Sequence, residues 1–443
     1  MSLYTFHRRR PGNAYINRNL WLPKDSIPVR VTKKRLTFRT AVGKNRDELF
    51  TFHAFREEER HLVVPRNFMS VKEVEEMGIP VTDLRPTSYE HVNMLHSIVP
   101  RAWQVEPTQK METVGDGTLN VACGKGKTVM ALYEAARMGV PTMVICQNGS
   151  ILKQWEREIR KFIDFDGDIR WVQGKSLPME APFALATIQT LYNRVDLLPR
   201  EFVRRWGLII FDEAHHVSAP QFCKAADLFP GRRLALTATA KRNDGLEKIY
   251  QYHLGEVFHV DLEQDLKPTI VFLALPGFDP PKHVNDDVSL KTWLSRDPEF
   301  NAVIAKEVRA ALKKGRTMLV LSHRIEQVMT LNELVPEGRS IFGTVKLEER
   351  DEILRSANPI FASMTLAKEG LDRPQLDTVL CATLFSNPND FQQVVGRVQR
   401  AFSGKQDPVA VFCVPSIDRC KKQARRLASF ARKAGYTVEH HRA

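Results

Sequence analysis

A glycine-rich turn in the segment VACGKGKTVMAL, residues 121–132, carries residue types suited to holding phosphate. Gly126, Lys127 and Thr128 match the end of the pattern G-x-x-x-x-G-K-[ST], although Val121 stands where the pattern begins with glycine. Backbone amides of such a turn and of a following helix N-terminus face phosphate oxygens. We therefore expect Lys127 to reach the β- and γ-phosphates of ATP and Thr128 to hold Mg²⁺.

The residues around this turn give it the context that a phosphate-binding loop requires. LNVA predicts a strand, CGKG a turn, and KTVMALYEAARM a helix. Gly124 and Gly126 lack a side chain, so the backbone can approach a ligand closely there. Lys125, between them, is also expected to bind the nucleotide, together with Lys127 and Thr128. Because G-x-G-K-T also occurs by chance, the turn needs support from other motifs.

A pair of acidic residues ends the apolar run in LIIFDEAHH, residues 208–216. A carboxylate at the end of a buried strand can hold Mg²⁺, and its neighbour can orient and deprotonate an attacking water. We assign these roles to Asp212 and Glu213. An exposed acidic turn would account for the pair but not for the whole sequence D-E-A-H, and metal binding by the adjacent His215 and His216 is not expected.

The pattern of apolar runs shows which elements must position these residues. Alternating strands and turns in residues 1–85 predict a small β-rich domain, with a hairpin over 35–55 and a helix capped by Ser70. Strands then alternate with helices over 86–264 and again over 265–415, which predicts an α/β fold with two parallel sheets. A basic helix follows in residues 416–443.

Composition limits the class of protein. The chain has 443 residues, 43% of them hydrophobic and 26% charged, and no apolar run approaches the roughly 18 residues of a membrane helix. No signal peptide is recognisable, so we expect a cytoplasmic protein without membrane contact. The six cysteines lack C-x-x-C spacing and are expected to be buried thiols.

Positive charge is concentrated at the two ends of the chain. The net charge is +13, while residues 1–50 hold 12 basic against 3 acidic side chains and residues 401–443 hold 9 against 3. Such clustering favours a polyanionic partner, nucleic acid first. Solvated tails would explain the charge equally well.

Together, D-E-A-H at 212–215 and G-K-T at 126–128 resemble the motifs of superfamily 2 helicases, a family in which the first glycine of the phosphate loop is commonly replaced. The resemblance implies two tandem RecA-like domains, ATP and Mg²⁺ as cofactors, and Asp212 as a Mg²⁺ ligand. Further motifs occur in the family's order across about residues 100–403. Those that the resemblance assigns to nucleotide binding and hydrolysis are Gln104 in RAWQ, Gly370 and Asp372 in TLAKEGLDRP, and Gln393, Arg397 and Arg400 in QVVGRVQR. It assigns the coupling of hydrolysis to movement to the hydroxyls of Thr237 and Thr239 in LTATA.

The resemblance also implies contacts with nucleic acid. It assigns them to Thr187 and Gln189 in TIQTL, Arg324 in LVLSHR, and Thr365 in TLAKEG. RAWQ departs from the family's R-P-Y-Q at Ala102 and Trp103, which puts adenine selectivity in doubt.

Within the superfamily, segments such as CGKGKT and KQWEREI are most similar to the DEAH-type XPB/RecG-like branch and its phage UvsW-type members. This similarity implies an ATP-dependent DNA helicase that remodels forked or branched duplex DNA, such as a Holliday junction, in recombination, repair or replication. We expect a monomer in the cytoplasm, which is that of the bacterial host if the protein is phage-encoded, and we expect residues 1–85 to bind DNA. The alternative activities are those of a duplex translocase that acts with a partner without separating strands, or of an RNA helicase. The alternative to DNA binding by residues 1–85 is that this domain only caps the first sheet.

Overall fold

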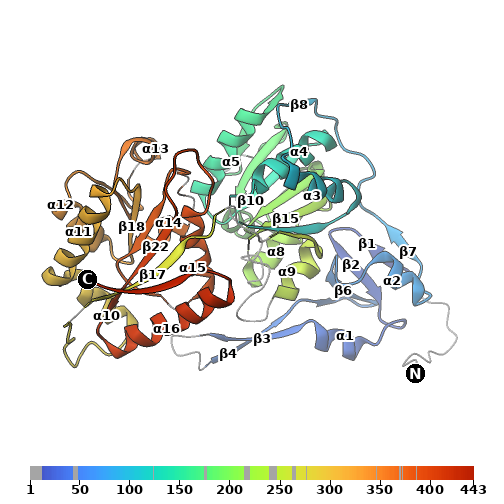
Figure 1. Ribbon diagram of the computed structural model, residues 1–443. Coiled ribbons are helices and arrows are strands. Elements are labelled where there is room, and N and C mark those ends of the chain that lie inside the picture. The colour runs from blue at the N-terminus through green and yellow to red at the C-terminus, as the bar shows by residue number, and fades with distance from the viewer. Residues whose placement is uncertain are drawn as a thin grey trace. The chain divides into compact units, whose positions relative to one another are not determined.

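The computed structural model describes residues 12–42, 48–122, 124–173, 177–213, 220–238, 247–261, 266–275, 277–345, 347–368, 371, 373–385 and 387–443. The chain divides into two compact units, residues 1–262 and residues 263–443 (Figure 1). The expected α/β fold with two parallel sheets and a β-rich N-terminal region is confirmed.

The first unit begins with a small five-stranded sheet. In spatial order its strands are β5 (Arg56–Glu57), β6 (His61–Pro65), β2 (Asn19–Pro23), β1 (Ala14–Ile16) and β7 (Val81–Asp83). Two short helices accompany it, α1 (Val29–Arg35) and α2 (Val71–Glu76). The expected capping box is present at α2, because Ser70 and Glu73 exchange hydrogen bonds between side chain and backbone.

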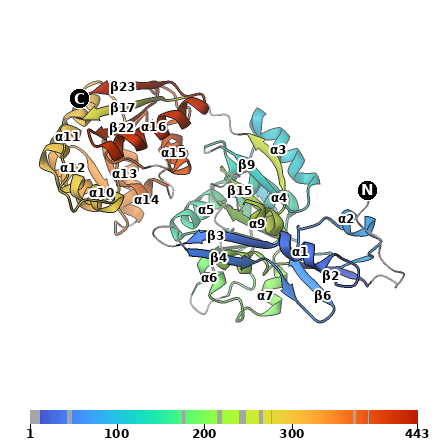
Figure 2. The same cartoon turned by 90° about the horizontal axis from the view of Figure 1, so that it is seen from below.

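A hairpin of β3 (Thr37–Val42) and β4 (Glu48–His53) forms a separate two-stranded sheet and extends from α1 (Figure 2). Its predicted turn at 43–45 lies outside the described residues. The hairpin begins and ends at one place, because the Ala54 amide donates to the Leu36 carbonyl at 2.8 Å and both residues are buried.

A seven-stranded sheet with every strand pair parallel forms the centre of the first unit. Its order is β12 (Ile169–Trp171), β13 (Phe183–Thr187), β10 (Thr142–Cys146), β14 (Leu208–Asp212), β15 (Arg232–Thr237), β9 (Gly117–Val121) and β16 (Val257–Asp261). Two separate apolar clusters contain alternate residues of the central strands. Strands covered on both faces read as continuous apolar runs, which is why the sequence predicted them.

The helices of this unit are α3 (Ala102–Thr113), α4 (Lys127–Met138), α5 (Gly149–Phe162), α6 (Ile188–Tyr192), α7 (Arg200–Arg205), α8 (Pro220–Ala226) and α9 (Glu247–Leu254). Strands β8 (Met94–His96) and β11 (Ile163–Phe165) form a separate antiparallel pair that belongs to neither the five-stranded nor the seven-stranded sheet. The sequence did not predict this pair.

Two buried arginines join the small sheet to the large one. Arg66, just after β6, and Arg233, in β15, are 1% and 0% exposed. The Arg233 guanidinium donates to the carbonyls of Arg18 and His253 at 2.7 and 2.6 Å. The N-terminal region is therefore part of the same compact unit as the seven-stranded sheet.

The second unit repeats the parallel architecture with a second seven-stranded sheet. Its order is β19 (Arg339–Ile341), β20 (Ile360–Ser363), β18 (Met318–Ser322), β21 (Thr378–Cys381), β22 (Val409–Pro415), β17 (Thr269–Leu275) and β23 (Val438–Arg442). The helices are α10 (Asp287–Arg296), α11 (Pro298–Lys313), α12 (Ile325–Leu334), α13 (Leu347–Ser356), α14 (Met364–Lys368), α15 (Pro388–Val395), the 3-10 turn η2 (Gly396–Val398) and α16 (Asp418–Lys433).

The end of the chain is integrated into this second unit. Leu427, Ala428 and Ala431 of α16 are buried in its core, and β23 pairs with β17. The sequence predicted a basic helix over residues 416–443, whereas the helix ends at Lys433 and the strand β23 follows it.

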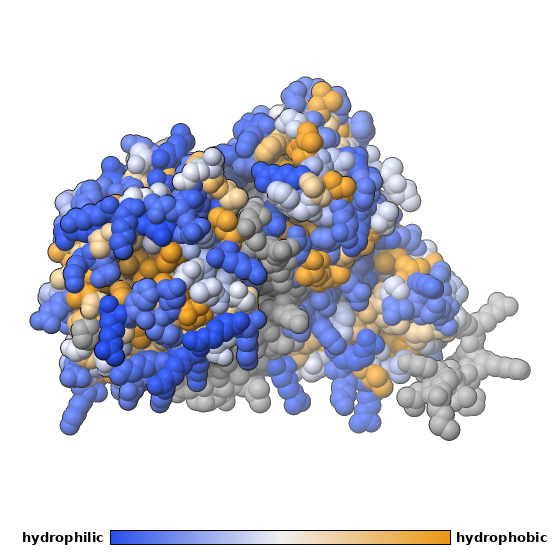
Figure 3. All heavy atoms as spheres, viewed as in Figure 1, coloured by the Kyte–Doolittle hydropathy of each residue, from blue (hydrophilic) through white to orange (hydrophobic). Residues whose placement is uncertain are grey.

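Hydrophilic side chains cover most of the face seen in Figure 3. Among the described residues, no helix is both long and apolar enough to cross a membrane. The five cysteines described are buried thiols outside any disulfide, as expected from their apolar surroundings.

Candidate nucleotide-binding site

The glycine-rich turn connects β9 to α4, as the sequence predicted. Gly124 and Gly126 have φ angles of 86° and 83°, in the left-handed region that favours glycine. A Cβ atom on Gly126 would also collide with the side-chain amide of Gln104. The conformation of the turn therefore depends on both glycines, and it places their backbone at the N-terminus of α4.

Lys127 lies in the first turn of α4, and its Nζ donates to the Val121 carbonyl at 3.0 Å. Val121 is the residue that replaces the first glycine of the motif. The replacement is compatible with the turn, because the contact that it makes with Lys127 uses only its backbone oxygen.

Gln104, which the resemblance assigns to nucleotide binding, is 4% exposed and hydrogen-bonded within the protein. Its Oε1 accepts from the Arg101 amide at 2.9 Å, and its Nε2 donates to the Lys125 carbonyl at 3.0 Å. The side chain thus ties the start of α3 to the phosphate turn. Next to it, the Trp103 ring lies 5.3 Å from both the Arg101 and the Lys125 cations.

Asp212 and Glu213 stand at the carboxyl end of β14. Asp212 Oδ1 accepts from the Glu213 amide at 3.0 Å, and Oδ2 accepts from the Trp155 indole nitrogen at 2.9 Å. Glu213 has a φ of 56°, the one positive φ among the described residues other than glycine. Such a backbone costs on the order of 1 kcal/mol or more and is typical of functional sites.

The electrostatics of the pair follow from this position. Burial first and the Glu213 carboxylate second raise the pKa of Asp212 to about 6, while the Trp155 hydrogen bond and Lys127 lower it. Burial and the same two carboxylates raise the pKa of Cys146, at the end of β10. Two adjacent carboxylates that repel each other fit Mg²⁺, which prefers few carboxylates plus phosphate oxygens.

Sheet topology explains why these residues share one edge. In the order β10-β14-β15-β9 all strands are parallel, so their carboxyl ends lie together. Cys146, Asp212, Thr237 and Val121 are the last residues of these strands. Thr237 is fully buried, and Thr239 lies outside the described residues.

In the second unit, the two candidate arginines follow α15, which carries the partly buried Gln393. Arg397 lies in η2 and donates from Nη1 to the Leu371 carbonyl at 2.9 Å. The Arg400 carbonyl accepts from Lys405 Nζ at 2.7 Å. Gly370 and Asp372 lie outside the described residues.

The four candidate nucleic-acid contacts differ in their surroundings. Thr187 caps α6 through the Thr190 amide at 3.1 Å, whereas Gln189 is exposed and donates to Asn193. Arg324 is held by α10, because it donates to the Thr292 hydroxyl and the Val288 carbonyl at 2.9 and 3.0 Å. Thr365 is exposed on α14.

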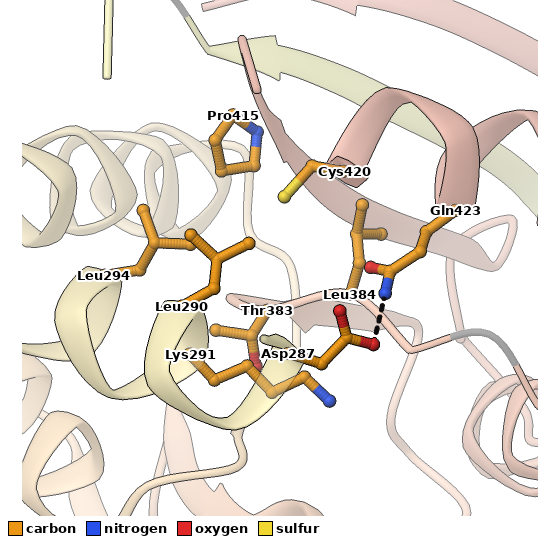
Figure 4. A pocket seen from close by; sticks show the side chains of 9 residues that line it. All are labelled: Asp287, Leu290, Lys291, Leu294, Thr383, Leu384, Pro415, Cys420 and Gln423. Carbon is orange, nitrogen blue, oxygen red and sulfur yellow. Dashed lines mark hydrogen bonds between the residues drawn. The ribbon is translucent and has the colours of Figure 1, made fainter. Parts of the chain in front are cut away.

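A concavity in the second unit is separate from these motifs (Figure 4). Leu290 and Leu294 of α10 form one wall, and Gln423 of α16 donates to Asp287 at 2.9 Å across the opening. Its volume of about 10 Å³ holds one water molecule and no nucleotide.

Two families match the chain in the order of its two units. Residues 93–242 match "Type III restriction enzyme, res subunit", and residues 301–402 match "Helicase conserved C-terminal domain". With the two parallel-sheet units, these matches place the chain in superfamily 2 of the helicases, the ATP-dependent nucleic-acid translocases.

Relatives within this class include viral and XPB-type proteins. The chain is 28% identical to "Probable helicase D10" of Escherichia phage T5, over 72% of each chain. It is 25% identical to L396 of Acanthamoeba polyphaga mimivirus, which is described as an ATP-dependent RNA helicase, over 74% of this chain and 66% of the relative. It is 23% identical to "DNA 3'-5' translocase XPB2" of Sulfurisphaera tokodaii, over 68% of this chain and 78% of the relative.

Among solved structures, Mss116p bound to single-stranded RNA and AMP-PNP is similar with a TM-score of 0.55 and 12% identity. The match covers 74% of this chain and 71% of that chain. At this identity the likeness concerns the fold alone.

Proposed function

We propose that this protein is an ATP-dependent DNA motor that remodels forked or branched duplex DNA, including by branch migration. The observation that carries the motor assignment is the site in the first unit. There a glycine turn, Lys127 and the Asp212–Glu213 pair meet at one edge of a parallel sheet. The preference for DNA rests on the XPB-type relatives and on the basic N-terminal region.

The chemistry follows from the positions of the side chains. Lys127 and the amides of the phosphate turn bind the phosphates of ATP. Glu213, which directly follows Asp212 at the carboxyl end of β14, orients the attacking water and takes its proton. From the resemblance to superfamily 2 helicases, we assign neutralisation of charge on the transferred γ-phosphate to Arg397 and Arg400.

Mg²⁺, when bound, would supply positive charge to the phosphate oxygens, and Thr128 and Asp212 are the residues that would hold it. Gln104 acts on the phosphate turn in addition to the adenine contact first expected of it. A shift of the phosphate turn on nucleotide binding would then be transmitted to the start of α3 through the hydrogen bond between the Lys125 carbonyl and Gln104.

An RNA substrate is the second candidate function, favoured by the name of the mimivirus relative. ATP hydrolysis should therefore be measured without nucleic acid and with single-stranded DNA, duplex DNA, a four-way junction or structured RNA, all at one salt concentration. Strong stimulation by the junction, with strand exchange on it, is the expected result. Stimulation by plain duplex alone would indicate a translocase, and stimulation by RNA alone would reject DNA as the substrate.

The DNA role of the N-terminal region can be tested on its hairpin. The outer part of this hairpin, residues 39–51, is here called the arm; it carries Arg39, Lys44 and Arg46, and Arg39 is exposed on β3. Because Phe38 and Phe52 pair with each other and pack against the small core, residues 39–51 can be replaced by a short glycine linker that keeps both rings in place. We expect weaker junction binding with unchanged basal ATPase, and unchanged junction binding would contradict a DNA role for the arm.

A further inference from the structure

The hydrogen bond between Trp155 and Asp212 is not explained by the superfamily motifs above. Trp155 lies on α5, whose N-cap is Asn148, just beyond the end of β10. Its side chain is 1% exposed and packs in one of the two clusters beside the seven-stranded sheet. Its indole nitrogen nevertheless lies 2.9 Å from Asp212 Oδ2 rather than among apolar groups.

The geometry fixes the carboxylate from two sides. Oδ2 accepts from the indole, and Oδ1 accepts from the Glu213 backbone at 3.0 Å. An indole N–H can donate but cannot accept, so it favours a carboxylate oxygen that is ionised and turned toward it. A rigid, buried ring thereby sets the orientation of Asp212, while each oxygen keeps a further lone pair for another partner.

We propose that Trp155 is a positioning residue of the nucleotide–Mg²⁺ site, which holds the Asp212 carboxylate in the orientation that binds the metal. Trp155 does not touch the nucleotide, and it acts only through Asp212. The inference rests on the proposed function, since it requires Asp212 to be a metal ligand. Groups that orient a metal ligand commonly change metal affinity or activity by about 10- to 100-fold when they are removed.

The chain offers two matched controls. Trp171, at the end of β12, also donates from its indole to a carboxylate, Glu156 Oε2, at 2.9 Å. Glu156 lies on α5, as Trp155 does, but this hydrogen bond does not involve Asp212. Trp206 is fully buried in the other cluster of the sheet, and its indole nitrogen has no hydrogen-bond partner among the described residues. Trp171→Phe removes an equivalent hydrogen bond, and Trp206→Phe removes an equivalent buried ring.

The test is the affinity for Mn²⁺, a paramagnetic substitute for Mg²⁺, in the presence of a non-hydrolysable ATP analogue, measured by electron paramagnetic resonance. We expect Trp155→Phe to weaken Mn²⁺ binding about tenfold, whereas Trp171→Phe and Trp206→Phe stay within about twofold of the wild type. The Mg²⁺ concentration for half-maximal ATPase should rise in parallel. Trp155→His, which keeps a ring N–H, should recover part of the affinity.

A double variant separates this inference from the site assignment. If Trp155 acts through Asp212, Trp155→Phe should cause no further loss in the Asp212→Asn background. Wild-type Mn²⁺ affinity in Trp155→Phe, with weakened affinity in Asp212→Asn, would overturn the role of Trp155 alone. Wild-type affinity in Asp212→Asn itself would overturn the proposed site. If Trp155→Phe does not fold, Trp155→Met gives the same comparison, because its apolar side chain also has no hydrogen-bond donor.

Discussion

Arg66 of the N-terminal region and Asp116, just before β9, form a buried bidentate ion pair, with Nε–Oδ2 and Nη2–Oδ1 distances of 2.7 Å. The guanidinium also donates to the carbonyls of Pro230 and Gly231 at 2.7 and 2.8 Å. Arg66 is therefore a structural residue and is not available to hold a phosphate. Burial alone would raise the pKa of the Asp116 carboxyl, but Arg66 and Arg233 keep it below its ordinary value.

Substitution of Arg66 should destabilise the first unit strongly. Arg66→Ala leaves a buried carboxylate without its main partner, which typically costs about 3–5 kcal/mol of unfolding free energy. Arg30→Ala, at an exposed position of α1, should change stability by less than about 0.5 kcal/mol. Urea denaturation compares the two variants, and equal stabilities would contradict a structural role for Arg66. For the same reason, excising the arm is a cleaner test of DNA binding than deleting residues 1–85.

Stability should depend on pH through His253, whose Nδ1 lies 2.7 Å from Asp227 Oδ1. Burial lowers the pKa of His253, but Asp227 outweighs it and raises this pKa to about 10, above the ordinary 6.5. The folded state thus binds the proton more tightly than the unfolded state does. The stabilisation is complete below pH 6.5 and is lost as the pH rises toward 10.

His253→Gln removes this proton and should flatten the dependence of unfolding free energy on pH between about 6.5 and 10. Denaturant unfolding at several pH values measures the slope for both proteins. A wild-type slope that persists in His253→Gln would mean that another group titrates. Asp227→Asn should flatten the same window, since it removes the charge that holds the proton on His253.

Lys127→Ala and Glu213→Gln should each abolish ATP turnover while leaving DNA binding in place. The lysine would no longer bind the phosphates, and a neutral amide cannot take a proton from water. ATPase and DNA-binding assays on the purified variants check this. Turnover at the wild-type rate in either variant would refute the residue's assigned role.

Lys405 should affect turnover through the main chain around Arg400. Its Nζ donates to the carbonyls of Val398 and Arg400 at 2.8 and 2.7 Å and to that of Pro374 at 3.3 Å. Lys405→Met keeps the stem but removes the donors, so we expect about a tenfold lower kcat with little change in ATP affinity. Lys421→Met, exposed on α16, is the control, and an equal loss in both variants would argue against this role.

Local sequence patterns predicted the parts of the fold that local physics determines. The phosphate turn, the strand ending at Asp212 and the capping box at Ser70 follow from apolar runs, glycine positions and residue spacing. The strand β23, VEHHR, is polar and exposed along most of its length, so no alternation or apolar run predicts it. Its pairing is decided by the neighbouring strand.

The contacts missed from the sequence depend on residues far apart in the chain. Trp155 lies 57 positions from Asp212, and Arg66 lies 50 positions from Asp116. Neither spacing is a local pattern, and a tryptophan on an apolar helix face predicts only burial. The similarity of KQWEREI to a helicase branch drew attention to the segment that contains Trp155, but it did not predict which group the indole N–H would contact.

The place of β23 beside β17 has a consequence for handling the protein. The outer neighbour of β17 is supplied by the final residues, Val438–Arg442, and β17 itself carries the apolar run TIVFLAL. If these residues were trimmed by a protease, an apolar strand with unsatisfied amides and carbonyls would form the border of the sheet. Such borders recruit strands from other molecules. In the intact protein, the charged and imidazole side chains of β23 make this border of the sheet hydrophilic.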